Sequence, residues 1–159
     1  MDSVRACLTF PERCEDAVNF YVSLIPNSRV LSMVRWADDA PAPVRGGGVM
    51  HCSFELDGIP YTAFDGGETF RFSEAFSLVA TCASQEEIDR LWDALAGEGG
   101  GPGPCGWVKD RFGVSWQVVP RQLGEMLGNA EGGDSEACMK AMLGMGKLDI
   151  AELERAYRG

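Results

Sequence analysis

Residues 105–120, CGWVKDRFGVSWQVVP, constrain the fold of this chain more than any other segment. Two short strand-like runs flank residues 110–113, a turn sequence with glycine at the position where a positive φ is easiest. The second run alternates between two sets of side chains, which are Val114, Trp116 and Val118 on one side and Ser115, Gln117 and Val119 on the other. The segment therefore predicts a β-hairpin that buries one face and carries the polar pair on its other face.

A βαβββ order of elements precedes this hairpin. Residues 15–24 have apolar side chains at helical spacing and are followed by Pro26, which predicts an amphipathic helix that ends there. Asp57-Gly58 is a turn sequence typical of a two-residue hairpin. The expected elements of this first module are a strand at residues 3–10, the helix at 15–24, and strands at 28–36, 49–56 and 59–64. Residues 37–48, rich in glycine and proline, are expected to form a loop.

The same order begins again after residue 67. A strand is expected at 76–82, and a helix at 84–96 opens with the capping-box pair Ser84 and Glu87. A glycine-proline loop at 97–104 leads into the 105–120 hairpin. We therefore expect an α+β fold built from two βαβββ modules in a single domain. Its parts are module one at residues 1–67, module two at 70–120 and a helical C-terminal extension at 121–159.

The C-terminal extension carries apolar side chains along its expected helices. Ile150, Leu153 and Tyr157 form one stripe, and Asp149 is the expected N-cap of that helix, with Glu152 three positions on. Residues 139–145 are rich in methionine and leucine. Burying such side chains stabilises a protein by roughly 1.5–3 kcal/mol each, so the stripe requires its own barrel or a second subunit as a partner. We predict a homodimer.

Composition excludes some classes of partner. Charged residues make up 24% of the chain and the net charge is −10, with no basic run, so neither nucleic acid nor an anionic membrane surface is an expected partner. No apolar run approaches the roughly 20 residues that cross a bilayer, and the N-terminus lacks the pattern of a signal peptide, which predicts a cytoplasmic protein. The six cysteines are dispersed without a CxxC pair, so buried thiols are expected rather than disulfides. Cys105, close to Lys109 and Asp110, is the one candidate for a reactive thiol, although no base stands beside it.

Several segments together resemble the PhnB-like branch of the vicinal oxygen chelate superfamily, which contains glyoxalases, bleomycin-resistance proteins and extradiol dioxygenases. This branch is often labelled 3-demethylubiquinone-9 3-methyltransferase. The segments that carry the resemblance are AVNFYVSLIPNSRVLS (17–32), SFELDGIPYTAFDGG (53–67), EAFSLVATCASQEEIDRLWDAL (74–95), CGWVKDRFGVSWQVVPRQLGEML (105–127) and MLGMGKLDIAELERAY (142–157). The resemblance implies two paired modules in a curved open barrel, a homodimer and a concave pocket for a small molecule.

Metal-dependent members of the superfamily bind their ion with histidine and carboxylate ligands from inner strands, and one such carboxylate aligns with Gln117. In this chain only His51, the sole histidine, and Glu55 on the same strand are suitable ligands. Two donors do not make a zinc or iron(II) site, which needs at least three. We therefore expect no metal and no other cofactor. The glycine run at 46–48 precedes a strand, so it is not the glycine-rich strand-to-helix loop that would bind S-adenosylmethionine.

Six residues are candidates for binding a ligand: His51, Ser53, Glu55, Trp107, Ser115 and Gln117. Alternation places the first three on one face of their strand and the last two on one face of theirs. For His51, a hydrogen bond to a neighbour and a role as pocket donor or acid/base group both remain open, and Trp107 could be core or pocket. The catalytic residues, if any, are unknown.

The leading hypothesis for function is a metal-free protein that binds a small molecule, of the sequestering resistance type. One alternative is a metal-dependent lyase, isomerase or dioxygenase that uses His51 and Glu55 with exogenous ligands. A second is the methyltransferase of the family label, which no S-adenosylmethionine motif supports. A third is a structural dimer with a vestigial pocket. Whether the chain is an enzyme stays open at this point.

Overall fold

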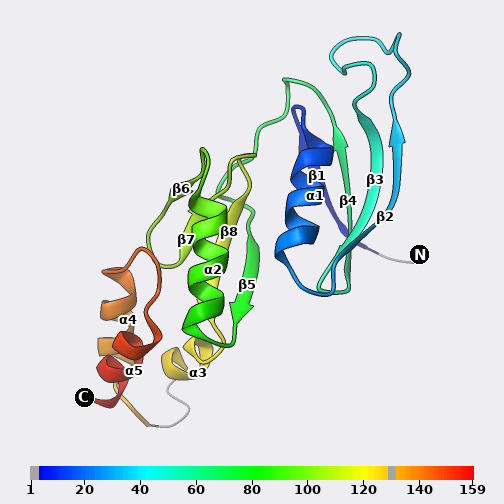
Figure 1. The fold of residues 1–159 in the computed structure, drawn as a ribbon. Helices are drawn as coiled ribbons and strands as arrows, with labels where there is room; N and C mark the ends of the chain where they lie inside the picture. The colour runs from blue at the N-terminus through cyan, green and yellow to red at the C-terminus, as the bar shows by residue number, and fades with distance from the viewer. Residues whose placement is uncertain (1–3, 129–131) are drawn as a thin grey trace. The chain divides into compact units, whose positions relative to one another are not determined.

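The computed structural model describes residues 4–128 and 132–159, and the chain divides into two compact units, Met1–Phe72 and Ser73–Gly159 (Figure 1). Each unit contains one four-stranded sheet. Within the described residues, no helix combines the length and the apolar character that crossing a membrane requires.

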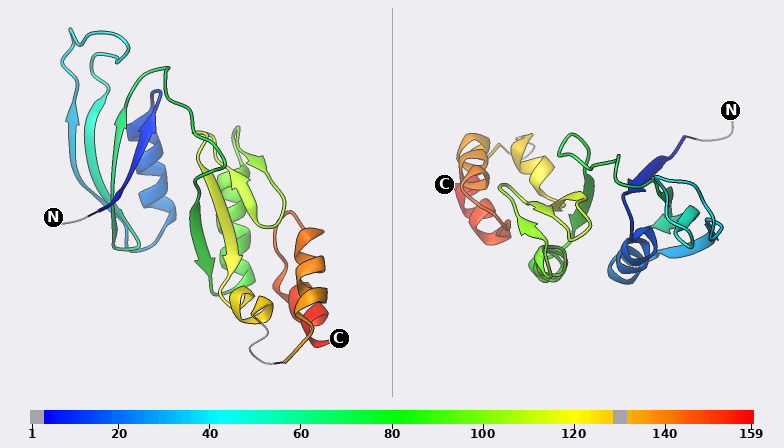
Figure 2. Two further views of the ribbon diagram at one scale, coloured as in Figure 1. Left: turned by 180° about the vertical axis from the view of Figure 1, so that it is seen from behind. Right: turned by 90° about the horizontal axis from the view of Figure 1, so that it is seen from above.

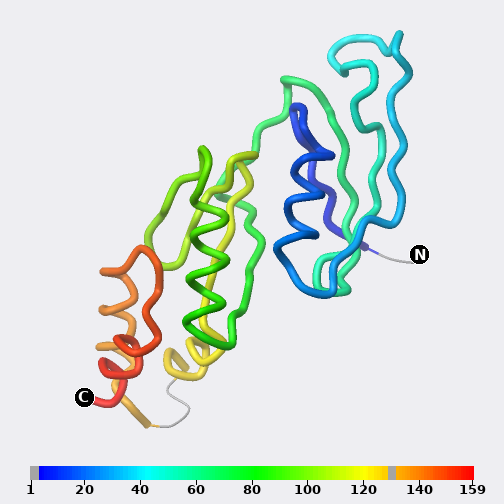
Figure 3. Tube along the Cα trace, in the orientation of Figure 1, coloured from blue at the N-terminus to red at the C-terminus, as the bar shows by residue number. Residues whose placement is uncertain are grey.

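Unit 1 has the βαβββ order that the sequence predicts. Its elements are β1 (Ala6–Phe10), α1 (Cys14–Leu24), β2 (Arg29–Arg35), β3 (Val49–Leu56) and β4 (Ile59–Asp65). The strands lie in the order β1-β4-β3-β2, with β1 parallel to β4 and the other pairs antiparallel. The Asp57-Gly58 turn joins β3 to β4, and both residues have positive φ, 49° and 74°, as a type I′ turn demands. The loop between β2 and β3 follows a long path in the chain trace (Figure 3).

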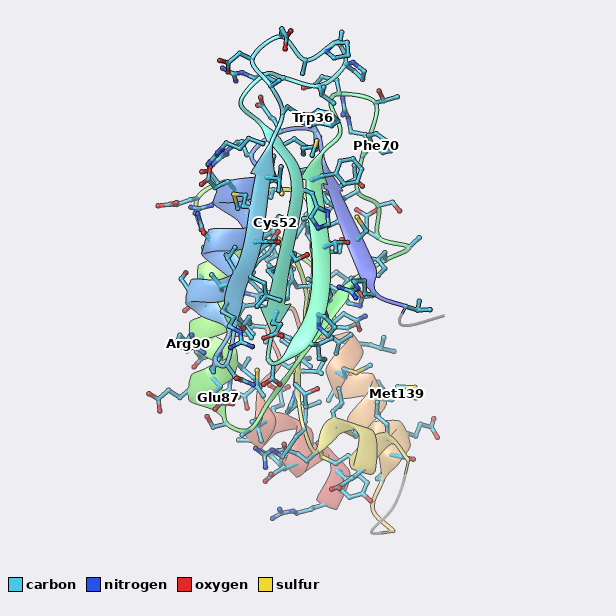
Figure 4. The ribbon with its side chains drawn as sticks, turned by 90° about the vertical axis from the view of Figure 1, so that its right-hand side faces the viewer. Trp36, Cys52, Phe70, Glu87, Arg90 and Met139 are labelled. Atoms are coloured by element: carbon cyan, nitrogen blue, oxygen red, sulfur yellow. The ribbon has the colours of Figure 1, made fainter. Side chains whose placement is uncertain are left out.

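Helix α1 covers one face of this sheet (Figure 2). Ala17, Val18 and Tyr21 of the helix are fully buried, as are Cys52 and Phe54 of β3. The opposite face of the sheet carries the alternate residues of each strand, because successive side chains on a strand point to opposite faces. That second face has no helix of its own unit packed on it, and Figure 4 shows the strands with α1 behind them.

Unit 2 repeats the arrangement. Its elements are β5 (Leu78–Cys82), α2 (Gln85–Ala96), β6 (Gly101–Pro102), β7 (Trp107–Lys109), β8 (Ser115–Pro120), α3 (Leu123–Leu127), α4 (Ser135–Leu143) and α5 (Ile150–Arg158). The strand order β5-β8-β7-β6 is the order of unit 1, again with the first pair parallel. This shared topology confirms the predicted α+β fold of two βαβββ modules. The second copy is shorter, as predicted: β6 has two residues where β2 has seven, and it lies inside the segment expected to be a loop.

Helix α2 begins with the predicted cap. The Ser84 hydroxyl accepts a hydrogen bond from the backbone N–H of Glu87 at 3.3 Å, and the Glu87 carboxylate accepts one from the N–H of Ala83 at 2.7 Å. The helix buries Ile88, Leu91 and Leu95. These side chains cover the face of β7 and β8 that carries Val108, Trp116 and Val118, each at most 2% exposed. The orientation of β8 thus agrees with the alternation in the sequence.

The C-terminal helices pack within unit 2. Their apolar cluster contains Leu123, Met126, Cys138, Leu148, Leu153 and Tyr157, and Val119 at the end of β8 packs against it. Asp149 caps α5 as predicted, accepting a hydrogen bond from the N–H of Glu152 at 2.8 Å. Leu153 and Tyr157 of the predicted stripe therefore find their partners in their own chain. Met139 and Leu143 of α4 remain 46% and 62% exposed.

Candidate functional site

Three of the predicted site residues lie on the face of unit 1 opposite α1. His51, Ser53 and Glu55 alternate along β3 with the buried Cys52 and Phe54, so all three side chains project away from the helix. His51 is exposed, and Ser53 and Glu55 are half-buried. The structure therefore brings these three together on the helix-free face, as the sequence predicts.

Each of these side chains has a partner close by. His51 Nε2 and Ser53 Oγ lie 3.1 Å apart, within hydrogen-bonding distance. Arg29 Nε of β2 donates to Glu55 Oε2 at 2.9 Å, and the arginine side chain is 71% exposed. Because this ion pair satisfies one carboxylate oxygen at the sheet edge, Glu55 is not an isolated donor waiting for a cation.

The strand register places a row of small polar side chains across the same face. Cys7 of β1 is paired with Thr62 of β4, Thr62 with Ser53, and Ser53 with Ser32 of β2. The row offers one thiol and three hydroxyl groups on four neighbouring strands, and Cys7 is exposed. Sequence reasoning found only Ser53 of this row, because the register between distant strands is not visible in local periodicity. The alternation of Thr62 with Tyr61 and Ala63 was the available signal.

In unit 2, Gln117 and Trp107 lie on the face opposite α2. They are directly paired across β8 and β7, and both are half-buried. Gln117 Nε2 donates to Ser77 Oγ at 2.8 Å, a contact that spans 40 positions in the sequence. Ser115 is on the same side of β8 as Gln117 but is only 3% exposed. Gln117 and Trp107 are therefore the predicted residues of this unit that solvent reaches.

Two buried carboxylates organise the ends of the sheets and were not singled out from the sequence. Asp110 is 3% exposed, and its Oδ1 accepts hydrogen bonds from the N–H groups of Phe112 and Val114 at 2.8 and 3.0 Å. Its Oδ2 accepts one from Trp116 Nε1 at 2.9 Å. In unit 1, Asp65 accepts hydrogen bonds from the backbone N–H groups of residues 14 and 49 at 2.8 and 2.7 Å. Both aspartates are structural, because backbone and indole donors satisfy them.

The donor set does not fit a catalytic zinc or iron(II) site. Within residues 4–128 and 132–159, no group of three or more histidine, cysteine, aspartate or glutamate side chains comes together. Burial raises the pKa of the Cys52 thiol to about 11 and also raises the pKa of Cys14, so neither is a ready thiolate ligand. Cys105 has no histidine or carboxylate partner among the described contacts, and its backbone N–H donates to the carbonyl of Met145 at 2.8 Å.

A charged cleft of ≈ 330 Å³ lies at the loop end of unit 1, away from all the predicted residues. Arg35 Nη2 contacts Glu15 Oε2 at 2.7 Å, and Arg45 Nη1 lies 3.9 Å from Glu12 Oε2. The glycine run at 46–48 lines the cleft and ends where β3 begins. It therefore precedes a strand, as the sequence indicates. The arginines of the cleft are matched by carboxylates, so it offers no unbalanced charge.

Comparison with known proteins identifies the family. The model of the 3-demethylubiquinone-9 3-methyltransferase family matches residues 2–119. No curated protein matches the chain. The PhnB protein from Bacillus cereus, which carries the same methyltransferase description, is 32% identical over 75% of this chain and 99% of its own, with a TM-score of 0.67. A protein from Pseudomonas aeruginosa is 25% identical over 74% of this chain and 98% of its own, with a TM-score of 0.60.

A more distant likeness extends to resistance proteins. The fosfomycin resistance protein FosX from Listeria monocytogenes, solved with Mn(II) and sulfate, is 14% identical over 80% of this chain and 98% of its own, with a TM-score of 0.56. At this identity the likeness concerns the fold alone. The family match ends at residue 119, so the helical extension, including the segment 142–157, lies beyond it. This chain belongs to the PhnB-like, 3-demethylubiquinone-9 3-methyltransferase family within the glyoxalase/bleomycin-resistance superfamily.

Proposed function

We propose that the protein binds a small organic molecule on the helix-free faces of its sheets and does so without a resident metal. The observation that carries this proposal is the division of each sheet into two unlike faces. One face is packed under a helix, and the other carries hydrogen-bonding side chains, with His51 and Ser53 in unit 1 and Gln117 and Ser77 in unit 2. Polar groups on a sheet face are costly to bury unless a partner satisfies them, and a bound ligand is such a partner.

The metal-dependent alternative receives less support from the side chains. His51 and Glu55 are two donors on one strand, and Glu55 is already paired with Arg29. A third protein ligand would have to come from another strand, and the neighbouring strands place Thr62 and Ser32 beside Ser53. Hydroxyl groups of this kind are weak ligands for zinc or iron(II). FosX, in contrast, was solved with Mn(II).

Methyl transfer also receives no support from the chain itself. The reaction in the family description requires S-adenosylmethionine, whose binding loops commonly join a strand to a helix through glycines. Here the only run of three glycines joins a loop to β3. We therefore regard the family description as a name and base the proposal on the two helix-free faces.

Native mass spectrometry of freshly purified protein tests this function. The spectrum is expected to show chains that carry a non-covalent organic mass, which denaturation releases. His51→Ala and Gln117→Ala should lose that mass, and Lys140→Ala, an exposed substitution on α4, should retain it. Retention of the mass by both face variants, or no bound mass from any expression host together with no binding from a metabolite library, would contradict the proposal.

A further inference from the structure

We propose that the helix-free face of the unit 2 sheet selects a neutral aromatic molecule that donates a hydrogen bond. This inference rests on the proposed function and adds the chemical class of the ligand. It concerns only the strands β5, β7 and β8, whose mutual positions are fixed by their backbone pairing.

One row of side chains crosses this face. Trp107 of β7 is paired with Gln117 of β8, and Gln117 is paired in turn with Val79 of β5. Neighbouring strands are roughly 4.8 Å apart, so the row is about 10 Å long, close to the length of a substituted aromatic ring. Val79 is 59% exposed, which is unusual for valine in the middle of a strand. The row therefore offers an indole and an isopropyl group on either side of one amide.

The amide in the middle of the row is oriented by its partner. Gln117 Nε2 donates to Ser77 Oγ at 2.8 Å, which uses the donor end of the side chain. The carbonyl end, Oε1, is then the group that the amide presents to a ligand. A molecule whose ring contacts Trp107 should therefore place an O–H or N–H group, rather than an ether or carbonyl oxygen, beside Gln117.

The charge of this face argues against an anionic ligand. The charged side chain on the helix-free side of β7 is Lys109, and it forms an ion pair with Glu74. The Lys109 ammonium lowers the pKa of the Glu74 carboxyl, so this glutamate is charged at neutral pH. The whole chain carries a net charge of −10, which repels anions further. A phosphonate or sulfonate would find no unmatched cation in the row.

Three probes of similar shape separate these requirements: 4-ethylphenol, 4-ethylanisole and 4-ethylbenzenesulfonate. They share a ring and differ in offering a donor, an acceptor alone, or a charge. Titration of ¹⁵N-labelled protein, followed by the indole signal of Trp107 and the side-chain amide signal of Gln117, reports binding at the row. We expect 4-ethylphenol to shift both signals and to bind about five- to tenfold more tightly than the other two probes, the contribution of one hydrogen bond.

Two variants and one control make the test specific. Gln117→Leu should bring 4-ethylphenol and 4-ethylanisole to equal affinity, and Trp107→Leu should weaken both about tenfold through lost aromatic contact. Leu143→Ala, on an exposed position of α4, should change neither affinity.

The outcomes separate this inference from the proposed function. Equal or tighter binding of the anisole or the sulfonate, an unchanged preference in Gln117→Leu, or binding confined to unit 1 would overturn the inference and leave the proposed function standing. If no probe shifts a signal on either helix-free face and the purified protein carries no organic mass, both are wrong.

Discussion

Trp116 and its neighbour Gln117 point to opposite faces of β8, and this predicts opposite consequences when each is truncated. Trp116 is 2% exposed under α2, and its indole N–H donates to the buried Asp110 at 2.9 Å. Trp116→Ala should lower the free energy of unfolding by about 3–5 kcal/mol, as large core truncations do. Trp116→Phe keeps a ring in the core but removes the donor to a carboxylate, which should cost about 1.5–3 kcal/mol.

Gln117→Ala should cost less than about 1 kcal/mol, because water can replace a half-buried amide as the partner of Ser77. Urea unfolding followed by circular dichroism gives the three free energies, and near-ultraviolet signals from the tryptophans of unit 2 report on that unit if the two units unfold separately. The expected order of damage is Trp116→Ala, then Trp116→Phe, then Gln117→Ala. A Gln117→Ala variant as unstable as Trp116→Ala would refute the assignment of the two faces.

Three further predictions concern metal, thiols and assembly. Elemental analysis of protein purified without a chelator or a histidine tag should find no stoichiometric transition metal; one metal ion per chain that is lost in His51→Ala would contradict this. Burial raises the pKa of the Cys52 and Cys82 thiols to about 11, so in mildly alkaline buffer they stay protonated. Peptide mapping should therefore find the exposed Cys7 alkylated by iodoacetamide well before them, and equal rates would show that the thiols are not protected. Light scattering should give twice the chain mass of 17.2 kDa, and a stable monomer at micromolar concentration would exclude the homodimer.

Local patterns were sufficient for most elements of the fold. The strand at 49–56 is predicted at the residues where β3 occurs, because alternation defines its length and Asp57-Gly58 defines its end. The cap at Ser84 likewise fixes the start of α2. β6 escaped prediction because Gly101 and Pro102 have poor strand propensity, and only pairing with β7 makes them a strand.

Alternation also predicted which face each site residue occupies, but it could not predict partners. Glu55 meets Arg29 across 26 positions, and Gln117 meets Ser77 across 40. These pairs depend on strand register, which arises from the packing of the whole sheet rather than from any short window. The same limit explains why Thr62 was overlooked.

The C-terminal extension shows how a correct physical premise can support more than one structure. The stripe of Leu153 and Tyr157 does require burial, and either its own chain or a second subunit could provide it. In the structure Gln85 of α2 helps to select the first solution. Its Nε2 donates to the carbonyl of Leu148 at 3.1 Å, and its Oε1 accepts from the N–H of Ile150 at 2.9 Å, which holds the start of α5 against α2.

Lys147 adds a second attachment beside this one. Its ammonium contacts the carboxylates of Asp93 and Asp89 on α2 at 2.8 and 3.2 Å. The extension is thus fixed to unit 2 by side chains of α2 as well as by its apolar cluster. The homodimer prediction consequently no longer draws on the α5 stripe; it depends on the exposed Met139 and Leu143 and on the family resemblance. Substituting both of these residues with serine should therefore dissociate a dimer that uses α4, whereas a dimer that survives this change must be formed by another surface.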